Sequence, residues 1–360
     1  MIFKNSSQSS QILFSLILGG SILLTGCGQQ QKNDAATQAS GTQPSSESAD
    51  LPKEVRLSWG GGPRIWVLGK IDGDFEKAFG TKVKWVEFAT GADVLNYFAA
   101  NEIDIARFGS SPAVAGISRG LPIEIIGLEG LISKAERLIV KNGIQSLKGL
   151  EGHTVGYPPN STAQYALEQA LALEKVDKSK IKFVPLKPAE LVSAWSRGDI
   201  DAAYVWGPFS QQLEKNGGKE IYATTSLNEQ GILVYNNFVV RKEFAEKYPD
   251  LVVKFLKTYQ HEVEEYQQDP KAAAEKISKY LNLPFDQVSA TLAGIEYIPL
   301  KDQATSKYLG SQPHEENSGI AKAAQNTAKF LVNIGELKSG DVAKSYAPHI
   351  NSQYLIEATK

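Results

Sequence analysis

The sequence predicts an α/β protein of two lobes, each a parallel sheet with crossover helices. An internal repeat is the main observation: residues 92–98 and 102–106 match residues 189–195 and 199–203 at a constant offset of 97 positions. The second observation is length, because residues 54–360 exceed one ordinary domain. The third is that the repeat gives way to helical periodicity in the last third of the chain.

Each copy of the repeat is predicted to be an amphipathic helix that leads into a short buried strand. The apolar residues first recur at helical spacing and then crowd together. Two earlier strands fit nearly the same offset, since residues 55–59 match 154–157 and residues 83–85 match 181–183. Several matches in register favour two similar lobes over chance.

The last third of the chain is predicted to form amphipathic helices over residues 249–266, with Pro249 in the first turn, and 320–334. These helices need a lobe to pack on, so we expect the chain to return to the first lobe. Two connections between lobes then form a hinge near Val140–Ile144 and Asn237–Val240. The predicted organisation is a signal peptide (1–26), a lipidated cysteine and tether (27–53), the first part of lobe 1 (54–141), lobe 2 (142–237), and the second, helical part of lobe 1 (238–360).

Cys27 is the only cysteine, and it ends the sequence Leu24-Thr25-Gly26-Cys27 after a short apolar run. That run is too short for the ~20 residues of a membrane-spanning helix. The pattern is typical of a bacterial lipoprotein signal, which is cleaved before the cysteine. We therefore expect a protein of the periplasm or cell envelope, held on a membrane by lipid on Cys27. Residues 28–53 are polar and lack aromatic residues, as expected of a flexible tether.

Composition excludes several classes of function. The chain has 38 basic and 40 acidic residues, a net charge of −2, and the two signs are interspersed. Nucleic acid is therefore not an expected partner, because phosphate binding needs clustered Lys and Arg. The four histidines are scattered without metal-ligand spacing, so we expect neither a metal nor another cofactor.

Ligands of open parallel sheets gather at the carboxyl ends of strands, and four loops follow predicted strands here. Two of these loops are predicted to begin a helix that is capped by a serine. The start of a helix presents free N–H groups, which favour anions. The first loop adds three flexible glycines and a forked cationic donor. These features predict an anion site without a metal. The aromatic residues Trp59, Tyr157 and Trp206 fit either core packing or cleft walls. The loops are Gly60-Gly61-Gly62-Pro63-Arg64, Gly109-Ser110-Ser111-Pro112, Pro158-Pro159-Asn160-Ser161-Thr162 and Trp206-Gly207-Pro208.

Three stretches, residues 108–112, 194–208 and 239–249, closely resemble the taurine-binding proteins of bacterial ABC importers, within the wider sulfonate, nitrate and thiamine-precursor group. The resemblance covers about residues 54–350. It implies a type II periplasmic-binding fold, whose lobes are joined by two strands and close on a small solute. It also implies a monomer that presents an anionic or zwitterionic sulfonate to a membrane permease.

The resemblance places the sulfonate-holding elements on specific residues. In taurine-type members, acidic residues suited to an ammonium group are expected at the positions of Arg64 and Asn236. This chain therefore favours a plain anion over a zwitterion, unless Glu129 supplies a partner for the ammonium. The implied ligand-binding residues are Gly60, Gly61, Gly62, Arg64, Ser110, Ser111, Ser161, Thr162, Trp206, Asn236 and Glu129.

Other functions stay open at this point. The solute could be another member of the same group, such as nitrate or a pyrimidine precursor of thiamine. Enzymes of that group, the pyrimidine-precursor synthases, carry a cysteine-rich motif that this chain lacks, so we expect a binding protein and not an enzyme. A surface sensor is a third possibility. Asp104 and Asp201 are of a type common in catalytic sites, but each lies at the start of its strand, at the end away from the cleft. We therefore expect a structural role for both.

Overall fold

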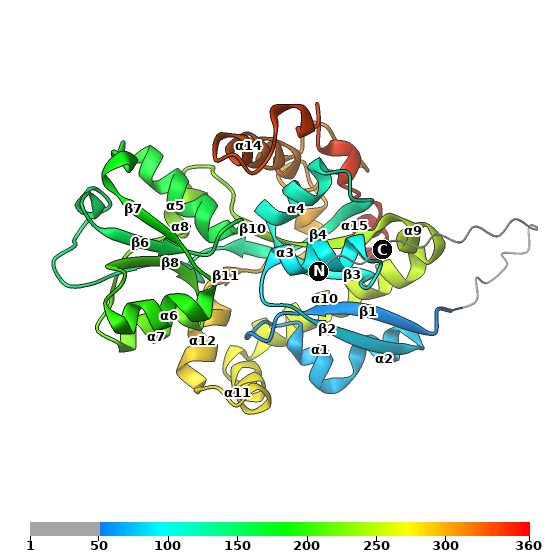
Figure 1. The fold of residues 1–360 in the computed structure, drawn as a ribbon. Helices are drawn as coiled ribbons and strands as arrows, with labels where there is room; N and C mark the ends of the chain where they lie inside the picture. Colours follow the sequence, from blue (N-terminus) through cyan, green and yellow to red (C-terminus); the bar gives the residue numbers. More distant parts are fainter. Residues whose placement is uncertain (1–50) are drawn as a thin grey trace, which may run out of the picture. The chain divides into compact units, whose positions relative to one another are not determined.

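Two β-sheets organise the part of the chain that the structure, a computed structural model, describes, residues 51–360. The strands are β1 (Glu54–Trp59), β2 (Lys82–Glu87), β3 (Ile105–Gly109), β4 (Ile123–Ile132), β5 (Glu136–Val140), β6 (Thr154–Tyr157), β7 (Lys182–Pro185), β8 (Ala202–Trp206), β9 (Lys219–Ala223), β10 (Tyr235–Arg241) and β11 (Ile295–Glu296). One sheet has the order β11-β4-β10-β3-β1-β2 and the other β7-β6-β8-β5-β9. Figure 1 shows the two sheets side by side.

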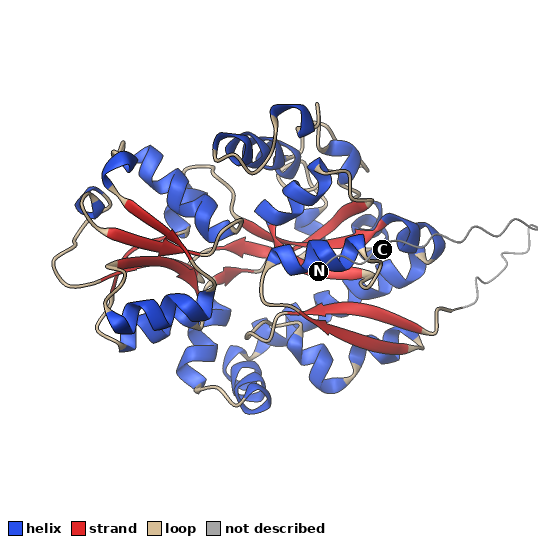
Figure 2. Ribbon diagram, in the orientation of Figure 1, coloured by secondary structure: helices blue, strands red, loops and turns tan. Residues whose placement is uncertain are grey.

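Helices lie above and below each sheet in the view of Figure 2. Within residues 51–360, none of them has the length and apolar character needed to cross a membrane. The helices are α1 (Val67–Asp72), α2 (Asp74–Phe79), α3 (Gly91–Ala99), α4 (Ser110–Ser118), α5 (Thr162–Leu173), α6 (Pro188–Arg197), α7 (Phe209–Lys215), α8 (Thr225–Glu229), α9 (Lys242–Lys247), α10 (Pro249–Gln268), α11 (Pro270–Leu281), α12 (Phe285–Ala293), α13 (Leu300–Gln303), α14 (Gly319–Asn333) and α15 (Gln353–Ala358).

The internal repeat is present in both sheets. In the first sheet β1 lies between β2 and β3 and runs parallel to both, and β6 has the same relation to β7 and β8 in the second. Asp104, just before β3, accepts hydrogen bonds of 2.9 Å from the backbone N–H and from Nε of Arg56. Asp201, just before β8, accepts one of 2.9 Å from the backbone N–H of Thr154. Both aspartates tie neighbouring strands together, which supports the structural role expected for them.

The sheets are mixed, however, and not purely parallel as the sequence predicted. Strand β10 runs antiparallel between β3 and β4, and β5 runs antiparallel between β8 and β9. The first residues of β5 pair with the last residue of β8, as in Glu136 opposite Trp206. Asn236 near the start of β10 likewise pairs with Gly109 at the end of β3. Each of these strands enters its sheet at the edge where the parallel strands end, so it must run the opposite way.

The connections between the sheets lie closer to the cleft than the predicted hinge. The first is Ser133–Ala135, between β4 and β5, and the second is residues 224–234, between β9 and β10. The predicted hinge residues Val140 and Asn237 are instead held in strand pairs, with Ala202 and Phe108 respectively. Strand β5, which the sequence assigned to lobe 1, thus belongs to the second sheet. The reason is that β5 is as apolar as β4, so composition does not mark where one sheet ends.

The two long helices predicted in the last third are present as α10 and α14. Helix α10 buries its apolar face on the first lobe, with Phe255 stacked on Phe75 of α2 at a ring separation of 5.5 Å. Helix α12 instead reaches the second lobe, where Gln287 donates a hydrogen bond of 3.3 Å to the Pro208 carbonyl. The last third therefore covers the first lobe and also touches the second.

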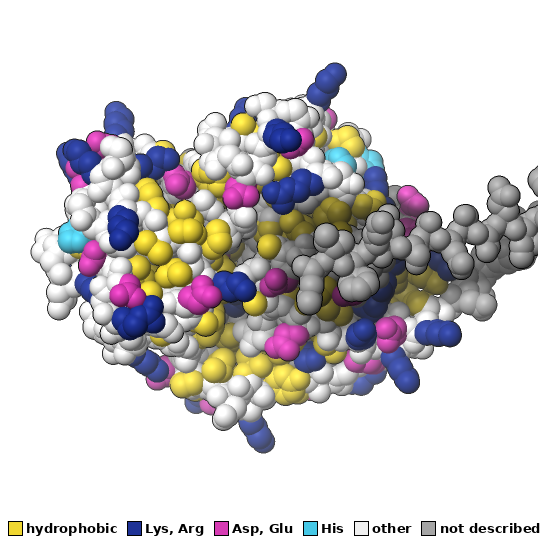
Figure 3. All heavy atoms as spheres, viewed as in Figure 1, with side chains coloured by type: hydrophobic (Ala, Val, Ile, Leu, Met, Phe, Trp, Pro, Cys, Tyr) yellow, Lys and Arg dark blue, Asp and Glu magenta, His cyan; other side chains and the backbone are white. Residues whose placement is uncertain are grey.

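The predicted signal peptide, Cys27 and most of the predicted tether lie outside the described residues. On the face drawn in Figure 3, acidic and basic side chains are scattered and no field of one sign appears.

Candidate functional site

A cavity of about 300 Å³ lies between the two sheets, at the carboxyl ends of β1, β3 and β8 and beside the loop after β6. All four loops singled out in the sequence contribute lining residues, so the structure brings them together as expected. From the predicted ligand-binding set, the residues that line the cavity are Gly60, Gly61, Gly62, Arg64, Ser161, Thr162, Trp206 and Asn236.

The loop after β1 carries Arg64 into the cavity. Gly61 has a φ of 67°, in the left-handed region that glycine adopts without strain. Nη1 of Arg64 donates a hydrogen bond of 2.6 Å to the Pro63 carbonyl, while its Nε has no hydrogen-bond partner among the described residues. The side chain is only 13% exposed. A buried, incompletely paired guanidinium is a donor that is ready for an anion.

A second arginine, Arg107 of β3, also lines the cavity, and the sequence did not predict it. Its Nε donates a hydrogen bond of 2.7 Å to Oε2 of Glu129, and its Nη2 contacts the same oxygen. Glu129 is fully buried and does not line the cavity. Its Oε1 lies 3.8 Å from Nε of Arg64. Glu129 therefore balances the charge of the arginines from behind, and is not placed to receive a ligand ammonium.

Burial and the charge of Arg107 both act on the Arg64 guanidinium. The pKa of Arg64 is lowered to about 10, first because burial disfavours the charged form and then because Arg107 repels it. The attraction of Glu129 acts in the opposite direction but is the smaller effect. This end of the cavity therefore remains positively charged at neutral pH.

Glu136, at the start of β5, is a second lining residue that the sequence missed. Its Oε1 accepts a hydrogen bond of 2.5 Å from the Thr162 hydroxyl, and its buried Oε2 has no partner among the described residues. Burial raises the pKa of Glu136 to about 7, against the opposing effects of the Thr162 hydrogen bond and of both arginines. The carboxyl group can therefore hold or release a proton near neutral pH.

The starts of α4 and α5 meet at this cavity. Ser161 caps α5: its hydroxyl accepts a 3.2 Å hydrogen bond from the Gln164 N–H and donates one of 2.6 Å to the Pro158 carbonyl. Helix α4 follows Gly109, which has no side chain to cap it. Ser110 and Ser111 are fully buried, do not line the cavity, and have hydroxyls without a partner in the described structure.

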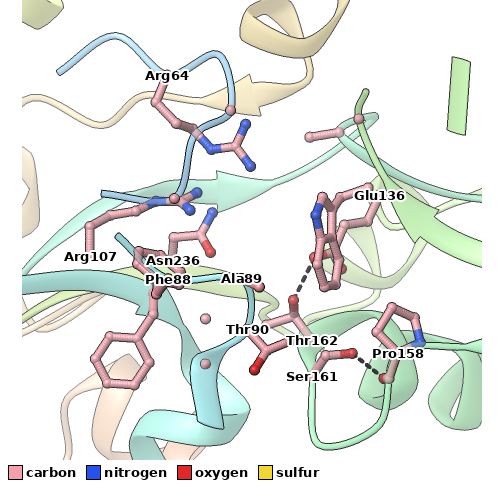
Figure 4. Close-up of a pocket in the computed structure, with 18 of the residues that line it drawn as sticks. Arg64, Phe88, Ala89, Thr90, Arg107, Glu136, Pro158, Ser161, Thr162 and Asn236 are labelled. Carbon is pink, nitrogen blue, oxygen red and sulfur yellow. Dashed lines mark hydrogen bonds between the residues drawn. The ribbon is translucent and has the colours of Figure 1, made fainter. Parts of the chain in front are cut away.

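Aromatic side chains form much of the remaining wall. Trp59 and Trp206, for which core packing and cleft lining were both open, line the cavity together with Trp66 and Phe88. Tyr157 does not, and packs edge-on against Phe183 at a ring separation of 6.0 Å. Figure 4 shows Arg64 and Arg107 on one side of the cavity, with Glu136, Thr162 and Ser161 facing them.

A signal for the two missed residues was present in the sequence. Arg107 interrupts the apolar strand Ile105–Gly109, and a charged residue inside a buried strand needs a buried partner. Glu136 opens a similar strand. Neither residue lies in one of the four loops that follow the predicted strands, and the strand-end pattern therefore does not mark them.

Residues 65–282 match the model of the NMT1-like family. This chain is a member of the NMT1-like family. It is 31% identical over 294 residues to the taurine-binding periplasmic protein of Escherichia coli (strain K12), which is 80% of this chain and 88% of that protein. The family implied by the sequence motifs is thus confirmed. The name of the Escherichia coli relative also supports the expectation of a binding protein and not an enzyme.

Two solved structures of periplasmic binding proteins share the fold. The alkanesulfonate-binding protein of Xanthomonas axonopodis pv. citri, bound to MOPS, matches with a TM-score of 0.70 at 22% identity, over 82% of this chain and 97% of that one. The periplasmic aliphatic sulphonate binding protein of Escherichia coli matches with a TM-score of 0.70 at 22% identity, over 84% of this chain and 92% of that one. The two-lobed type II periplasmic-binding fold is therefore confirmed.

Proposed function

We propose that this protein is the extracytoplasmic solute-binding receptor of an ABC importer, and that it binds a small organic sulfonate between its lobes. The observation that carries the proposal is the cavity at the strand ends, where Arg64 and Arg107 share a single close carboxylate, Glu129. An anion completes the charge balance of such a site. The named binding functions of the relatives in Escherichia coli and Xanthomonas support a sulfonate as this anion.

Binding in this proposal works by a shift of population and not by chemistry. The cavity takes Arg64 and Arg107 from the first lobe, and Glu136 and Thr162 from the second. A ligand touches both sets only when the lobes are closed, so its differential affinity favours the closed state. The permease of the importer would then recognise that state.

We further propose that lipid on Cys27 holds the receptor at the membrane, where the short distance raises its effective concentration near the permease. The test is partitioning of the mature protein into a detergent phase. The wild-type protein should partition with the detergent, and Cys27→Ala should remain in the aqueous phase. Equal partitioning of the two proteins would contradict the anchor.

A ligand panel tests the receptor function. We would measure thermal unfolding of the purified protein with propane-1-sulfonate, taurine, sulfate, nitrate and an aminopyrimidine. A ligand present at 100 times its Kd adds about 2.7 kcal/mol of stability, which raises the melting temperature measurably. Stabilisation by at least one sulfonate is the expected result. Stabilisation by nitrate or the aminopyrimidine, with no effect of any sulfonate, would overturn the proposal.

A further inference from the structure

One end of the cavity carries an excess of positive charge. Oε2 of Glu129 receives both contacts from Arg107, and its Oε1 is 3.8 Å from Nε of Arg64. One carboxylate therefore serves two guanidinium groups that are only 13% and 11% exposed. A buried charge without a partner is costly, so this end is suited to an anionic group that pairs with Arg64 in the forked geometry.

The opposite end is a second place where negative charge is favoured. Gly109, which precedes α4, and Thr162, the first residue of α5, both line the cavity, so two helix starts meet there. Each helix start carries about half a positive charge. The side chain of Glu136 joins this end through the Thr162 hydroxyl, and its buried Oε2 has no partner among the described residues.

Glu136 is placed to donate a hydrogen bond to a ligand anion. Its pKa is raised to about 7 by burial, so a large share of the carboxyl groups is protonated near neutral pH. A nearby ligand anion favours the protonated form further, and a protonated Oε2 is a donor. With Glu136 neutral, the two arginines, Glu129 and the two helix starts sum to about two positive charges. A dianion matches that charge, whereas a monoanion or a zwitterion leaves part of it unbalanced.

The two ends lie on opposite sides of one cavity. Figure 4 shows the side chains of Arg64 and Arg107 across the cavity from Glu136 and Thr162. Phe88 contributes to the wall of the same cavity. The cavity volume of about 300 Å³ equals roughly ten water molecules at ~30 Å³ each, which leaves room for a short carbon chain between two acidic groups.

We infer that the ligand is a sulfonate with a second acidic group, such as a sulfocarboxylate, whose two anionic ends lie at the Arg64–Arg107 pair and at the starts of α4 and α5. This inference rests on the proposed receptor function and narrows its ligand class. One ligand with two acidic groups can then pair with the two arginines at one end and with the two helix starts at the other.

Three ligands of matched length test the inference by isothermal titration calorimetry at pH 7. They are 3-sulfopropanoate (a dianion), propane-1-sulfonate (a monoanion) and taurine (a zwitterion). The Kd of 3-sulfopropanoate should be at least roughly tenfold lower than either of the others, as one further charge-assisted hydrogen-bond pair implies. Equal or tighter binding of propane-1-sulfonate or taurine would overturn the inference and leave the receptor function intact. If none of the three binds and nitrate or an aminopyrimidine does, both proposals fail.

A variant locates the sulfonate end of the ligand. Arg64→Gln should raise the Kd of propane-1-sulfonate and of 3-sulfopropanoate by roughly tenfold each, because both place a sulfonate at the Arg64–Arg107 pair, and the preference for 3-sulfopropanoate should remain. Arg197→Gln is the matched control, because Arg197 is exposed on the second lobe and, within residues 51–360, forms an ion pair only with Asp199. It should leave all three Kd values unchanged. An unchanged Kd of propane-1-sulfonate in Arg64→Gln would contradict the assignment, and the ranking in the wild-type protein decides the ligand class even if this variant unfolds.

Discussion

Gly109 of the first lobe and Thr162 of the second approach so closely that a methyl group on Gly109 would lie 2.8 Å from Cγ2 of Thr162. This is closer than two carbon atoms pack without strain. Both residues line the cavity, so the contact brings the two lobes together at the wall of the ligand site. The absence of a side chain at position 109 is therefore a condition for closing the cavity.

Gly109→Ala should weaken ligand binding by favouring the open state. The φ of Gly109 is −66°, which alanine adopts freely, so the effect comes from the contact and not from the backbone. Overpacking of this kind costs about 1–3 kcal/mol, which raises the Kd for propane-1-sulfonate about 5- to 150-fold. Calorimetry measures the Kd, and small-angle scattering should give a larger radius of gyration in the presence of ligand.

A second substitution provides the rescue. Thr162→Ser removes Cγ2 but keeps the hydroxyl that donates to Glu136, so Gly109→Ala combined with Thr162→Ser should recover most of the affinity. Gly340→Ala is the control, because a methyl group there would lie within 4 Å of no other atom in the described part of the chain. A double variant no tighter than Gly109→Ala alone would show that the contact does not control closure.

Glu129→Gln should destabilise the folded protein. The substitution leaves Arg107 buried without its carboxylate, and breaking a buried ion pair costs about 3–5 kcal/mol. Chemical denaturation measures the free energy of unfolding, with Glu174→Gln on the exposed end of α5 as the control. A loss below about 1 kcal/mol would mean that Glu129 does not balance the arginines.

The sequence predicted the fold well where its pattern was local. The repeat located the parallel strands, because an amphipathic helix and a buried strand leave a readable spacing. The sequence did not predict that β5 and β10 run antiparallel to their neighbours, because the residue pattern of an apolar strand is the same in either direction. The hinge was misplaced for the same reason, since Val140 and Asn237 continue apolar strands and their pairing partners are far apart in sequence.

The candidate site was predictable in part. Loops with glycine, serine and proline mark strand ends, and these led to Arg64 and Thr162. Arg107 and Glu136 lie within strands, so their importance depends on which strand each one faces in the folded protein. Glu129 was expected as a ligand for an ammonium group, but the sequence could not show that Arg107 would occupy its carboxylate.

Stability should fall as the pH rises from about 4.5 to 7. The pKa of Glu136 is about 7 in the folded protein, so over this interval the folded state holds a proton that the unfolded state has released. The stability from this group is complete below pH 4.5 and is lost as pH rises through 7, by roughly 3 kcal/mol. Glu262, whose pKa burial raises to about 8, acts in the same direction.

Denaturation of the wild-type protein and of Glu136→Gln at several pH values checks this slope. The variant should lose the part of the slope that Glu136 causes and keep the part from Glu262. Glu174→Gln, at an exposed position, should follow the wild-type curve. Parallel curves for Glu136→Gln and the wild type would rule out a raised pKa at this site.

Proton exchange on binding distinguishes the classes of ligand. A ligand anion near Glu136 raises its pKa further, so binding of 3-sulfopropanoate at pH 7.5 should take up protons from the buffer. A ligand ammonium beside the same carboxylate lowers the pKa, so binding of taurine in that pose should release protons. Calorimetry in two buffers of different ionisation enthalpy gives the sign and the number of protons. Glu136→Gln should abolish the exchange, and proton release on binding of 3-sulfopropanoate would contradict the role of Glu136 as a hydrogen-bond donor to the ligand.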